Sequence, residues 1–207
     1  MATEKSKFVS LTFDDGPSLY TNEILDILLF YDVKATFFVV GEEVKKYPEI
    51  IERINKEKHV IGNHTWDHPL IRGIASTELS NQILKTNSII KDILGEEPII
   101  FRAPYGKMDH DSYNVIQNLG LTSVLWNVSS QDWKRNSIKI EKLVLKKSIS
   151  SGIILLHDGD QFGSGPRDDT VHALPKIIEG LILKNFTFLT IPEFYNQCFK
   201  IETRKNI

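Results

Sequence analysis

Two histidines and two aspartates stand out as candidate ligands for a divalent cation. His64 and His68 are four residues apart, and on a helical turn that spacing places both imidazoles on one face, within reach of one ion. Taken alone, a His-x3-His pair is more often two surface or capping histidines. Asp14 or Asp15 could add a carboxylate oxygen, and two histidines with one carboxylate form an open site that leaves positions for water and substrate.

The adjacent carboxylates of Asp14 and Asp15 repel each other, so their pairing needs an explanation. A cation bound to one of them would offset the repulsion and leave the other free to act as a base. The alternative is a solvated turn, because the sequence Asp-Asp-Gly-Pro at residues 14–17 has good turn chemistry.

Further side chains of functional type lie later in the chain. His157 follows the apolar residues 153–156 and could be a general acid or base, or a hydrogen-bonded structural residue. Arg102 could pair with a carboxylate of the site, and Asp132 could act there or cap the next helix. Aromatic faces stack on the C–H faces of sugar rings, although single aromatic residues are usually packing residues. The candidates to line a sugar-binding groove are Trp66, Tyr105 and Trp133.

Short β-branched or aromatic runs alternate with longer segments of helical period. We expect strands at residues 8–13, 35–40, 59–62, 98–102, 121–127, 152–157 and 186–190. We expect helices at residues 21–31, 42–58 with an interruption near Pro48, 77–94 between Thr77 as N-cap and Gly95 as C-cap, 109–119, 138–150 and 170–184. The alternation predicts an α/β fold with a parallel sheet covered by helices, either an open doubly wound sheet or a closed, imperfect barrel.

The unusual polar clusters follow the ends of the expected strands. They lie at residues 12–16, 63–68, 102–105, 127–133 and 155–158. In a parallel sheet or barrel all strand C-termini lie on one rim. Structural residues have no reason to prefer that rim, so we expect these side chains to converge into one site.

The composition is that of an ordinary globular chain. It has 207 residues, of which 41% are hydrophobic and 25% charged, so it is neither disordered nor a disulfide-dense mini-protein. No linker splits the alternating elements, and we expect a single domain over residues 1–207. The formal net charge of −2 gives no electrostatic case for nucleic acid, and one cysteine, Cys198, cannot form an internal disulfide.

The sequence as given shows no targeting or membrane segment. Residues 1–7 lack the apolar stretch of a secretory signal, and the longest apolar runs fall far short of the ~18 residues that a membrane helix needs. We expect a cytoplasmic chain as it stands, with a truncated secreted or cell-wall protein as the alternative. The sequence carries no signal for an oligomeric state.

With these residues the chain resembles the polysaccharide deacetylases, also called the NodB-homology domain or carbohydrate esterase family four. The resemblance runs from about residue 8 to about residue 194 and rests on ordered motifs at the expected strand ends. The motifs are TFDDG at residues 12–16, HTWDH at 64–68, RAPY at 102–105, DW at 132–133 and LLH at 155–157.

The resemblance implies a distorted seven-stranded parallel (β/α) barrel. It also implies metal-dependent removal of acetyl groups from an N-acetylated glycan, usually from N-acetylglucosamine units of chitin oligomers, peptidoglycan or a similar polymer. On this pattern Asp15, His64 and His68 hold the metal, generally zinc, with cobalt or another divalent ion as the alternative.

The resemblance gives the other motif residues separate roles around the scissile amide. These roles are Asp14 as general base, Arg102 as its orienting partner, His157 as general acid, Asp132 as the residue that tunes His157, the Tyr105 backbone N–H as an oxyanion donor, and Leu155 with Trp133 as the walls of the acetyl-methyl pocket.

One departure and two alternatives follow from the same residues. Many members of the family carry an acidic residue three positions before Asp132, where this chain has Ser129, which leaves the environment of His157 and the substrate preference open. A catalytically silent carbohydrate-binding module would be expected to lose a metal ligand or the base, and all are present. An amidase of a non-sugar or cyclic amide on the same barrel would keep them.

Overall fold

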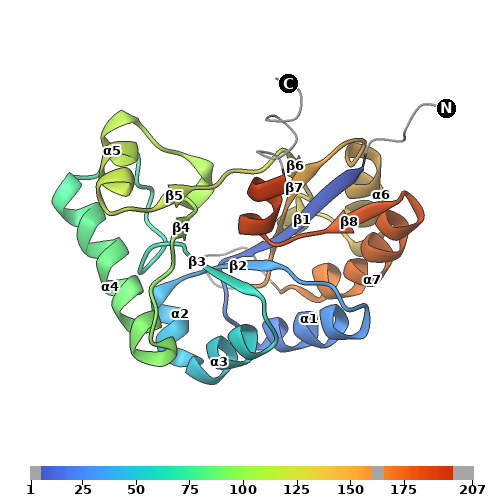
Figure 1. The fold of residues 1–207 in the computed structure, drawn as a ribbon, viewed down its shortest axis with the longest axis horizontal. Helices are drawn as coiled ribbons and strands as arrows, with labels where there is room; N and C mark the ends of the chain where they lie inside the picture. The colour runs from blue at the N-terminus through green and yellow to red at the C-terminus, as the bar shows by residue number, and fades with distance from the viewer. Residues whose placement is uncertain (1–5, 160–165, 198–207) are drawn as a thin grey trace.

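The protein is built on one parallel sheet, seen in a computed structural model that describes residues 6–159 and 166–197 (Figure 1). The strands are β1 (Lys7–Asp14), β2 (Thr36–Val39), β3 (Val60–Asn63), β4 (Ile100–Phe101), β5 (Thr122–Ser123), β6 (Val128–Ser129), β7 (Gly152–His157) and β8 (Phe186–Phe188). The helices are α1 (Leu19–Phe30), α2 (Gly41–Lys46), α3 (Pro48–Lys56), α4 (Ser76–Leu94), α5 (His110–Asn118), α6 (Ser137–Lys147) and α7 (Asp168–Leu183), with the 3-10 turns η1 (Pro104–Gly106) and η2 (Asp132–Lys134). Residues 191–197 are also helical, and Cys198 lies outside the described residues.

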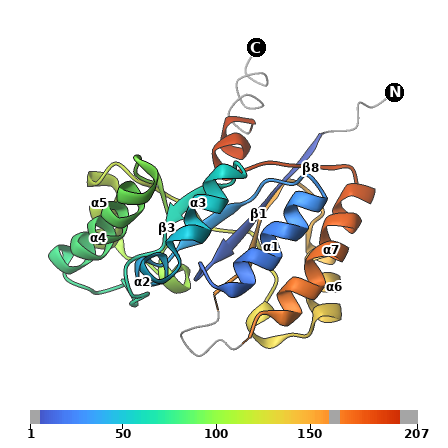
Figure 2. The same ribbon diagram turned by 90° about the horizontal axis from the view of Figure 1, so that it is seen from below.

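The sheet is a curled half-barrel. Its strands run in the order β5-β4-β3-β2-β1-β7-β6, and all the pairings are parallel. β2 pairs with the C-terminal half of β1, whereas β8 pairs with its N-terminal end. Helices α4 and α5 stand beyond one edge, and α6 and α7 cover the other (Figures 1 and 2). The expected distorted parallel (β/α) barrel is therefore confirmed.

The expectation of one strand over residues 121–127 was wrong, because two short strands at opposite edges take its place. β5 pairs with β4, and β6 pairs with β7. The connection between them crosses from one edge of the sheet to the other (Figure 1), with Val124 buried and Trp126 half-buried along it. An apolar run that crosses between two edges has the composition of a strand, so the sequence pattern could not separate the two cases.

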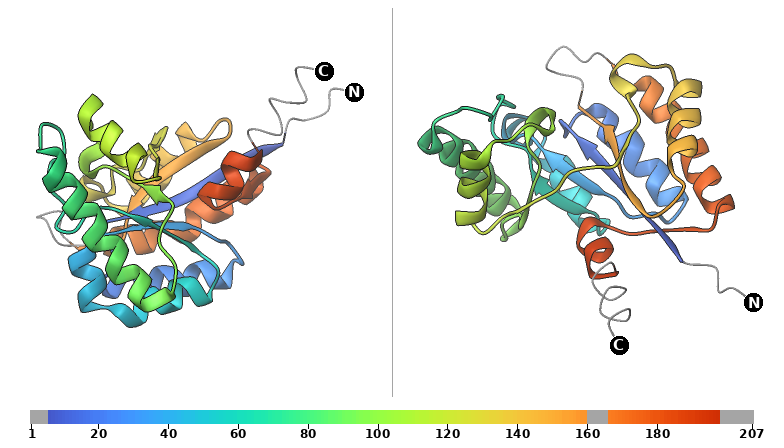
Figure 3. Two further views of the ribbon diagram at one scale, coloured as in Figure 1. Left: turned by 60° about the vertical axis from the view of Figure 1, so that its left-hand side comes forward. Right: turned by 90° about the horizontal axis from the view of Figure 1, so that it is seen from above.

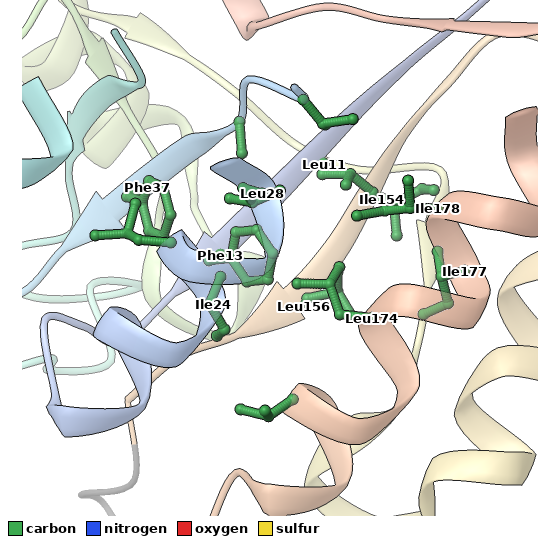
Figure 4. Close-up of a cluster of buried hydrophobic side chains, with 14 of the residues drawn as sticks. Leu11, Phe13, Ile24, Leu28, Phe37, Ile154, Leu156, Leu174, Ile177 and Ile178 are labelled. Atoms are coloured by element: carbon green, nitrogen blue, oxygen red, sulfur yellow. The ribbon is translucent and has the colours of Figure 1, made fainter. Parts of the chain in front are cut away.

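The alternation of side chains along β1 decides which residues face the inside of the half-barrel. Leu11 and Phe13 point outward, where they pack against α1 and α7 (Figure 4). Thr12 and Asp14 therefore point inward, because successive side chains of a strand lie on opposite faces. The outward cluster also includes Ile24, Leu28, Ile154, Leu156, Leu174, Ile177 and Ile178.

The inside of the half-barrel is filled from the end opposite to the strand C-termini. Residues 191–197 lie near the N-terminal end of β1 (Figure 3). Ile191 and Phe194 from this segment form an inner cluster with Phe38, Ile100 and Val124. The apolar cluster occupies one end of the half-barrel, and the polar clusters that follow the strands lie at the rim of the other end.

Local signals set several helix boundaries. Pro48 is the first residue of α3 and separates it from α2, as expected. Gly95 ends α4 with φ +81°, a left-handed conformation that suits glycine, also as expected. Thr77 is not the N-cap, because α4 begins at Ser76 after Ala75. No helix within the described residues is both long and apolar enough to cross a membrane.

Candidate metal centre and catalytic pocket

The two aspartates lie at the C-terminal end of β1, in a tight turn that separates their side chains. Asp15 has φ +76°, and the peptide bond between Gly16 and Pro17 is cis. A Cβ at Gly16 would lie 2.1 Å from the Asp158 carboxylate, so glycine is required there. The Asp158 backbone N–H donates to the Asp14 carbonyl (3.1 Å), which joins this turn to the end of β7.

The histidine pair is positioned by a turn that is not helical. His64 directly follows β3, and both Thr65 (φ +70°) and His68 (φ +59°) have left-handed backbone conformations. The Asn63 side chain accepts the Thr65 N–H (2.8 Å), and the Thr65 hydroxyl accepts the His68 N–H (3.2 Å). These bonds close the turn and bring both imidazoles to one side.

Asp15, His64 and His68 form a buried cluster whose donor set fits a divalent cation. One ligand atom from each lies within 4.8 Å of the other two. Asp15 Oδ1 is 3.4 Å from His64 Nε2 and 3.2 Å from His68 Nε2. The Nδ1–H of His64 donates to the Arg102 carbonyl (2.7 Å), and this bond leaves the Nε2 lone pair directed to the cluster. One carboxylate and two imidazoles are ligands that suit zinc and similar ions.

The charge of Asp15 is maintained in spite of burial. Desolvation opposes ionisation of its carboxyl, but the adjacent His64 and His68 side chains and the charge of His157 outweigh it, so the pKa of Asp15 lies well below its ordinary value. An ionised carboxylate is the form that binds a cation.

Asp14 is held by a buried arginine on the inner side of the sheet. Arg102 Nη1 donates to Asp14 Oδ1 (2.7 Å), and both side chains are almost fully buried. The Arg102 guanidinium lies 4.0 Å from the centre of the Phe38 ring. Burial lowers the pKa of Arg102 and the charge of Asp14 opposes that shift. The second oxygen, Asp14 Oδ2, lies 3.9 Å from His64 Nε2, beside the three candidate metal ligands.

His157 and Asp132 form a second ion pair across the pocket. The His157 Nδ1–H donates to Asp132 Oδ1 (2.7 Å), and the His157 backbone N–H donates to Asp132 Oδ2 (2.8 Å). The Thr170 hydroxyl donates to the same Oδ2 (3.0 Å). Desolvation of His157 favours the neutral ring, but the Asp132 carboxylate outweighs it and raises the pKa of His157 to about 9. The imidazolium is therefore the stable form near neutral pH.

These groups open into one pocket of about 330 Å³. The Tyr105 ring meets His68 edge-on with 4.8 Å between ring centres, and Trp133 meets His157 in the same way at 5.3 Å. Tyr105 has φ +60° in the turn η1. Leu155 completes this side of the pocket, two residues before His157 along β7 and therefore on the same face of the strand. The structure thus brings the motif residues from five strand ends together.

Two residues that line the pocket, Trp126 and Arg167, were not among the site residues predicted from the sequence. Trp126 lies in the connection between the edge strands that the sequence pattern assigned to a strand. Arg167 is buried and donates from Nε to the Gly159 carbonyl (2.6 Å). A tryptophan inside an apolar run and an arginine before a helix have no local feature that marks them as pocket residues.

Trp66 does not join the aromatic groove that the sequence suggested. Its ring packs against Gly41, where a Cβ would lie 2.4 Å from the indole, and Lys85 lies 3.7 Å above it. Trp66 does not line the catalytic pocket. Ser129 lies in β6 and pairs in register with Leu155.

The chain was compared with known families, proteins and structures. The family model described as polysaccharide deacetylase matches residues 2–124. A peptidoglycan-N-acetylglucosamine deacetylase of Bacillus cereus is 40% identical over 189 residues, which cover 90% of this chain and 68% of that protein. A chitooligosaccharide deacetylase of Sinorhizobium fredii is 37% identical over 194 residues, which cover 89% of this chain and 90% of that protein.

A solved structure shows the same likeness in three dimensions. The crystal structure of the Bc1960 peptidoglycan N-acetylglucosamine deacetylase, in complex with 4-naphthalen-1-yl-N-oxidanyl-benzamide, superimposes with a TM-score of 0.87 at 39% identity. The match covers 91% of this chain and 88% of that chain. The family match, the sequence relatives and the structural likeness agree, and the chain belongs to the polysaccharide deacetylase family.

Proposed function

We propose that the chain is a metal-dependent N-deacetylase that hydrolyses the acetamide of N-acetylglucosamine units in a glycan such as a chitin oligomer or peptidoglycan. The observation that carries this proposal is the arrangement of two buried pairs around the metal cluster, with Arg102–Asp14 beside it and Asp132–His157 across the same pocket. The named deacetylases among the relatives support the substrate class.

In this function Asp15, His64 and His68 hold the divalent ion. Their carboxylate and imidazole donors favour zinc, with cobalt or another divalent ion as the alternative. When bound there, such an ion would supply Lewis acidity, which would lower the pKa of a water molecule and polarise the amide carbonyl.

Asp14 acts as the general base. Its Oδ1 is occupied by the Arg102 donor, so Oδ2 is the oxygen available to take a proton from water. The charge-assisted hydrogen bond from the buried guanidinium fixes the direction of the Asp14 side chain. The water oxygen then forms the new bond to the carbonyl carbon.

His157 acts as the general acid. An amine leaves poorly unless its nitrogen is protonated, and the Asp132 carboxylate keeps His157 in the imidazolium form that can donate that proton. As the C–N bond breaks, the nitrogen receives a proton from His157 and the glycan leaves as a free amine with acetate as the second product.

The remaining motif residues hold the acetyl group. The Tyr105 backbone N–H is the donor for the developing oxyanion, and one such donor is worth ~3 kcal/mol of transition-state stabilisation. Leu155 and Trp133 offer the apolar surface for the acetyl methyl group. Trp126 adds a further aromatic face to the same pocket.

The test is acetate release by the purified chain. Chitin oligomers, peptidoglycan fragments and small cyclic imides are supplied side by side with Zn²⁺ or Co²⁺, and products are identified by mass spectrometry. Metal-dependent acetate release with formation of glucosamine units is expected, and a chelator abolishes it. Glycan binding without acetate release under every metal condition would identify a silent binding module, and hydrolysis of cyclic imides alone would identify a different amidase.

A further inference from the structure

We propose that Thr12 is a positioning residue for the reaction, which fixes the arginine that orients the general base. This inference rests on the proposed function, in which Asp14 is that base. Thr12 is two residues before Asp14 on β1, so both side chains point to the inside of the half-barrel. Thr12 is fully buried, and its hydroxyl is bonded to Ile154 of β7 and to Arg102, which follows β4.

The direction of each hydrogen bond around Thr12 is determined by the chemistry of the partners. The Thr12 hydroxyl donates to the Ile154 carbonyl (2.7 Å), because a carbonyl can only accept. Its oxygen lone pairs are then available to Arg102 Nη1, which donates to Thr12 Oγ1 (2.7 Å) and to Asp14 Oδ1 (2.7 Å). One guanidinium nitrogen is thus held by the threonine hydroxyl and by the base.

Arg102 depends on these two bonds because its other donors are poorly satisfied. The guanidinium is fully buried, so it cannot exchange a lost partner for bulk water. Its Nη2 makes no hydrogen bond to a described residue, and its bond from Nε to the Val124 carbonyl is long (3.3 Å). Without the Thr12 acceptor, the Arg102 side chain keeps its bond to Asp14 and the long contact to the Val124 carbonyl as its hydrogen bonds to described residues.

The Thr12 bonds also tie the base to the strand that carries the acid. Ile154 lies on β7, three residues before His157, and Thr12 pairs in register with Leu155 of the same strand. Arg102 follows β4. A single hydroxyl therefore connects the three elements that carry Asp14, Arg102 and His157, and it sets their relative positions without contact with substrate.

The experiment compares Thr12→Val with Thr12→Ser and with a matched control. Valine keeps the shape of threonine but removes the hydroxyl, whereas serine retains it. Thr36 is the register partner of Thr12 on β2, equally buried, and its hydroxyl accepts the Ile191 N–H (3.1 Å), away from the catalytic groups. Thr36→Val therefore removes a buried threonine hydroxyl at the same level of the sheet.

We expect Thr12→Val to lower kcat by ~10- to 100-fold, the span of a hydrogen bond to a charged group, with KM and Zn²⁺ affinity unchanged. Thr12→Ser restores most of kcat, and Thr36→Val leaves kcat of the folded protein unchanged. In an Arg102→Gln background, Thr12→Val has little further effect, because the two residues act through one contact. If the valine variant does not fold, Thr12→Ala supplies the same readout.

A wild-type kcat in Thr12→Val, or additive effects of the Thr12 and Arg102 changes, would overturn the proposal. A fall in Zn²⁺ affinity equal to the fall in kcat would also do so, because Thr12 would then act on the metal cluster. A wild-type chain that releases no acetate refutes the proposed function instead. A crystal structure of Thr12→Val then tests the positioning role by itself, with a displaced Arg102 expected and an unmoved Arg102–Asp14 contact as the contrary result.

Discussion

At the scale of single residues, the two neighbouring aspartates have different contacts and therefore different roles. Asp14 is bound by Arg102, whereas Asp15 faces His64 and His68. The repulsion between the adjacent carboxylates is therefore reduced by separate partners. The Arg102 guanidinium binds Asp14, and the two histidines contact Asp15. The left-handed backbone at Asp15 is what separates the side chains.

This difference in contacts predicts different effects for the same substitution at the two aspartates. Asp14→Asn removes the base but leaves the metal ligands in place, so we expect turnover to fall by at least ~10²-fold with metal content unchanged. Asp15→Asn removes the anionic ligand, so we expect metal content itself to fall. Atomic absorption and acetate release on both variants provide the check, and equal metal loss in the two would refute the assignment.

The same scale gives a prediction for the acid. His157→Ala should lower kcat by ~10²- to 10⁴-fold with metal affinity nearly unchanged, because His157 is not among the metal ligands. In Asp132→Asn the imidazolium loses the carboxylate that raises the pKa of His157. Activity that requires the protonated ring is lost as pH rises through that pKa, so the alkaline limb of kcat moves to lower pH. An unmoved limb would exclude His157 as the acid.

At the scale of elements, the strands and their polar ends could be predicted, and the turns between them could not. Period-two and period-3.6 patterns located β1, β7 and most helices, and motif residues at strand ends were expected to share a rim. The conformation of the histidine turn could not be predicted, because its left-handed residues, Thr65 and His68, are not glycines. Trp126 and Arg167 reach the pocket because of the tertiary fold of the chain, which local sequence patterns do not specify.

The histidine turn depends on the side chain of Asn63, which anchors it to a helix. Asn63 Oδ1 accepts the Thr65 N–H, and its Nδ2 donates to the Ile83 carbonyl (2.9 Å) and to Asn87 Oδ1 (2.7 Å) of α4. Because the residue is fully buried, Asn63→Ala leaves several polar groups without partners, at a cost of about 1–3 kcal/mol each.

We expect Asn63→Ala to weaken Zn²⁺ binding although Asn63 is not a ligand, since outer partners of metal ligands typically contribute ~10- to 100-fold in affinity. Isothermal titration with Zn²⁺ measures this directly. Asn87→Ala is the matched control, because it removes only one partner of Asn63 and should reduce affinity less. Wild-type affinity in Asn63→Ala would show that the turn holds its shape without this anchor.

At the scale of the whole molecule, the half-barrel divides polar from apolar ends. The inner apolar cluster that includes Ile191 and Phe194 fills the N-terminal end of the strands, and the ionisable groups gather at the other rim. The buried charges at that rim are paired between side chains from different strands. The contacts that build the site therefore also offset the desolvation cost of burying these charges. One buried titratable group, His59, lies away from this rim and reports on the stability of the fold alone.

His59 predicts how the stability of the whole protein changes in acid. Its Nδ1 accepts the Ala35 N–H (3.1 Å), and burial, reinforced by the charge of Lys34, lowers its pKa to about 4. In the unfolded chain the ring takes up a proton near its ordinary pKa of about 6.5, so between these values the unfolded state binds more protons. The stabilisation is complete above about pH 6.5 and is lost as pH falls towards 4, by about 3 kcal/mol in total.

The matched variant is His59→Asn, because the Asn side-chain oxygen can accept the same Ala35 N–H but does not titrate. Urea unfolding of metal-free wild type and variant from pH 7 to pH 4 isolates the contribution of His59, since every other group is common to both. We expect the wild type to lose stability more steeply by about 3 kcal/mol over this range. Parallel curves would mean that His59 is protonated as readily in the folded protein as in the unfolded chain, and that its burial among the core residues has no effect on its charge.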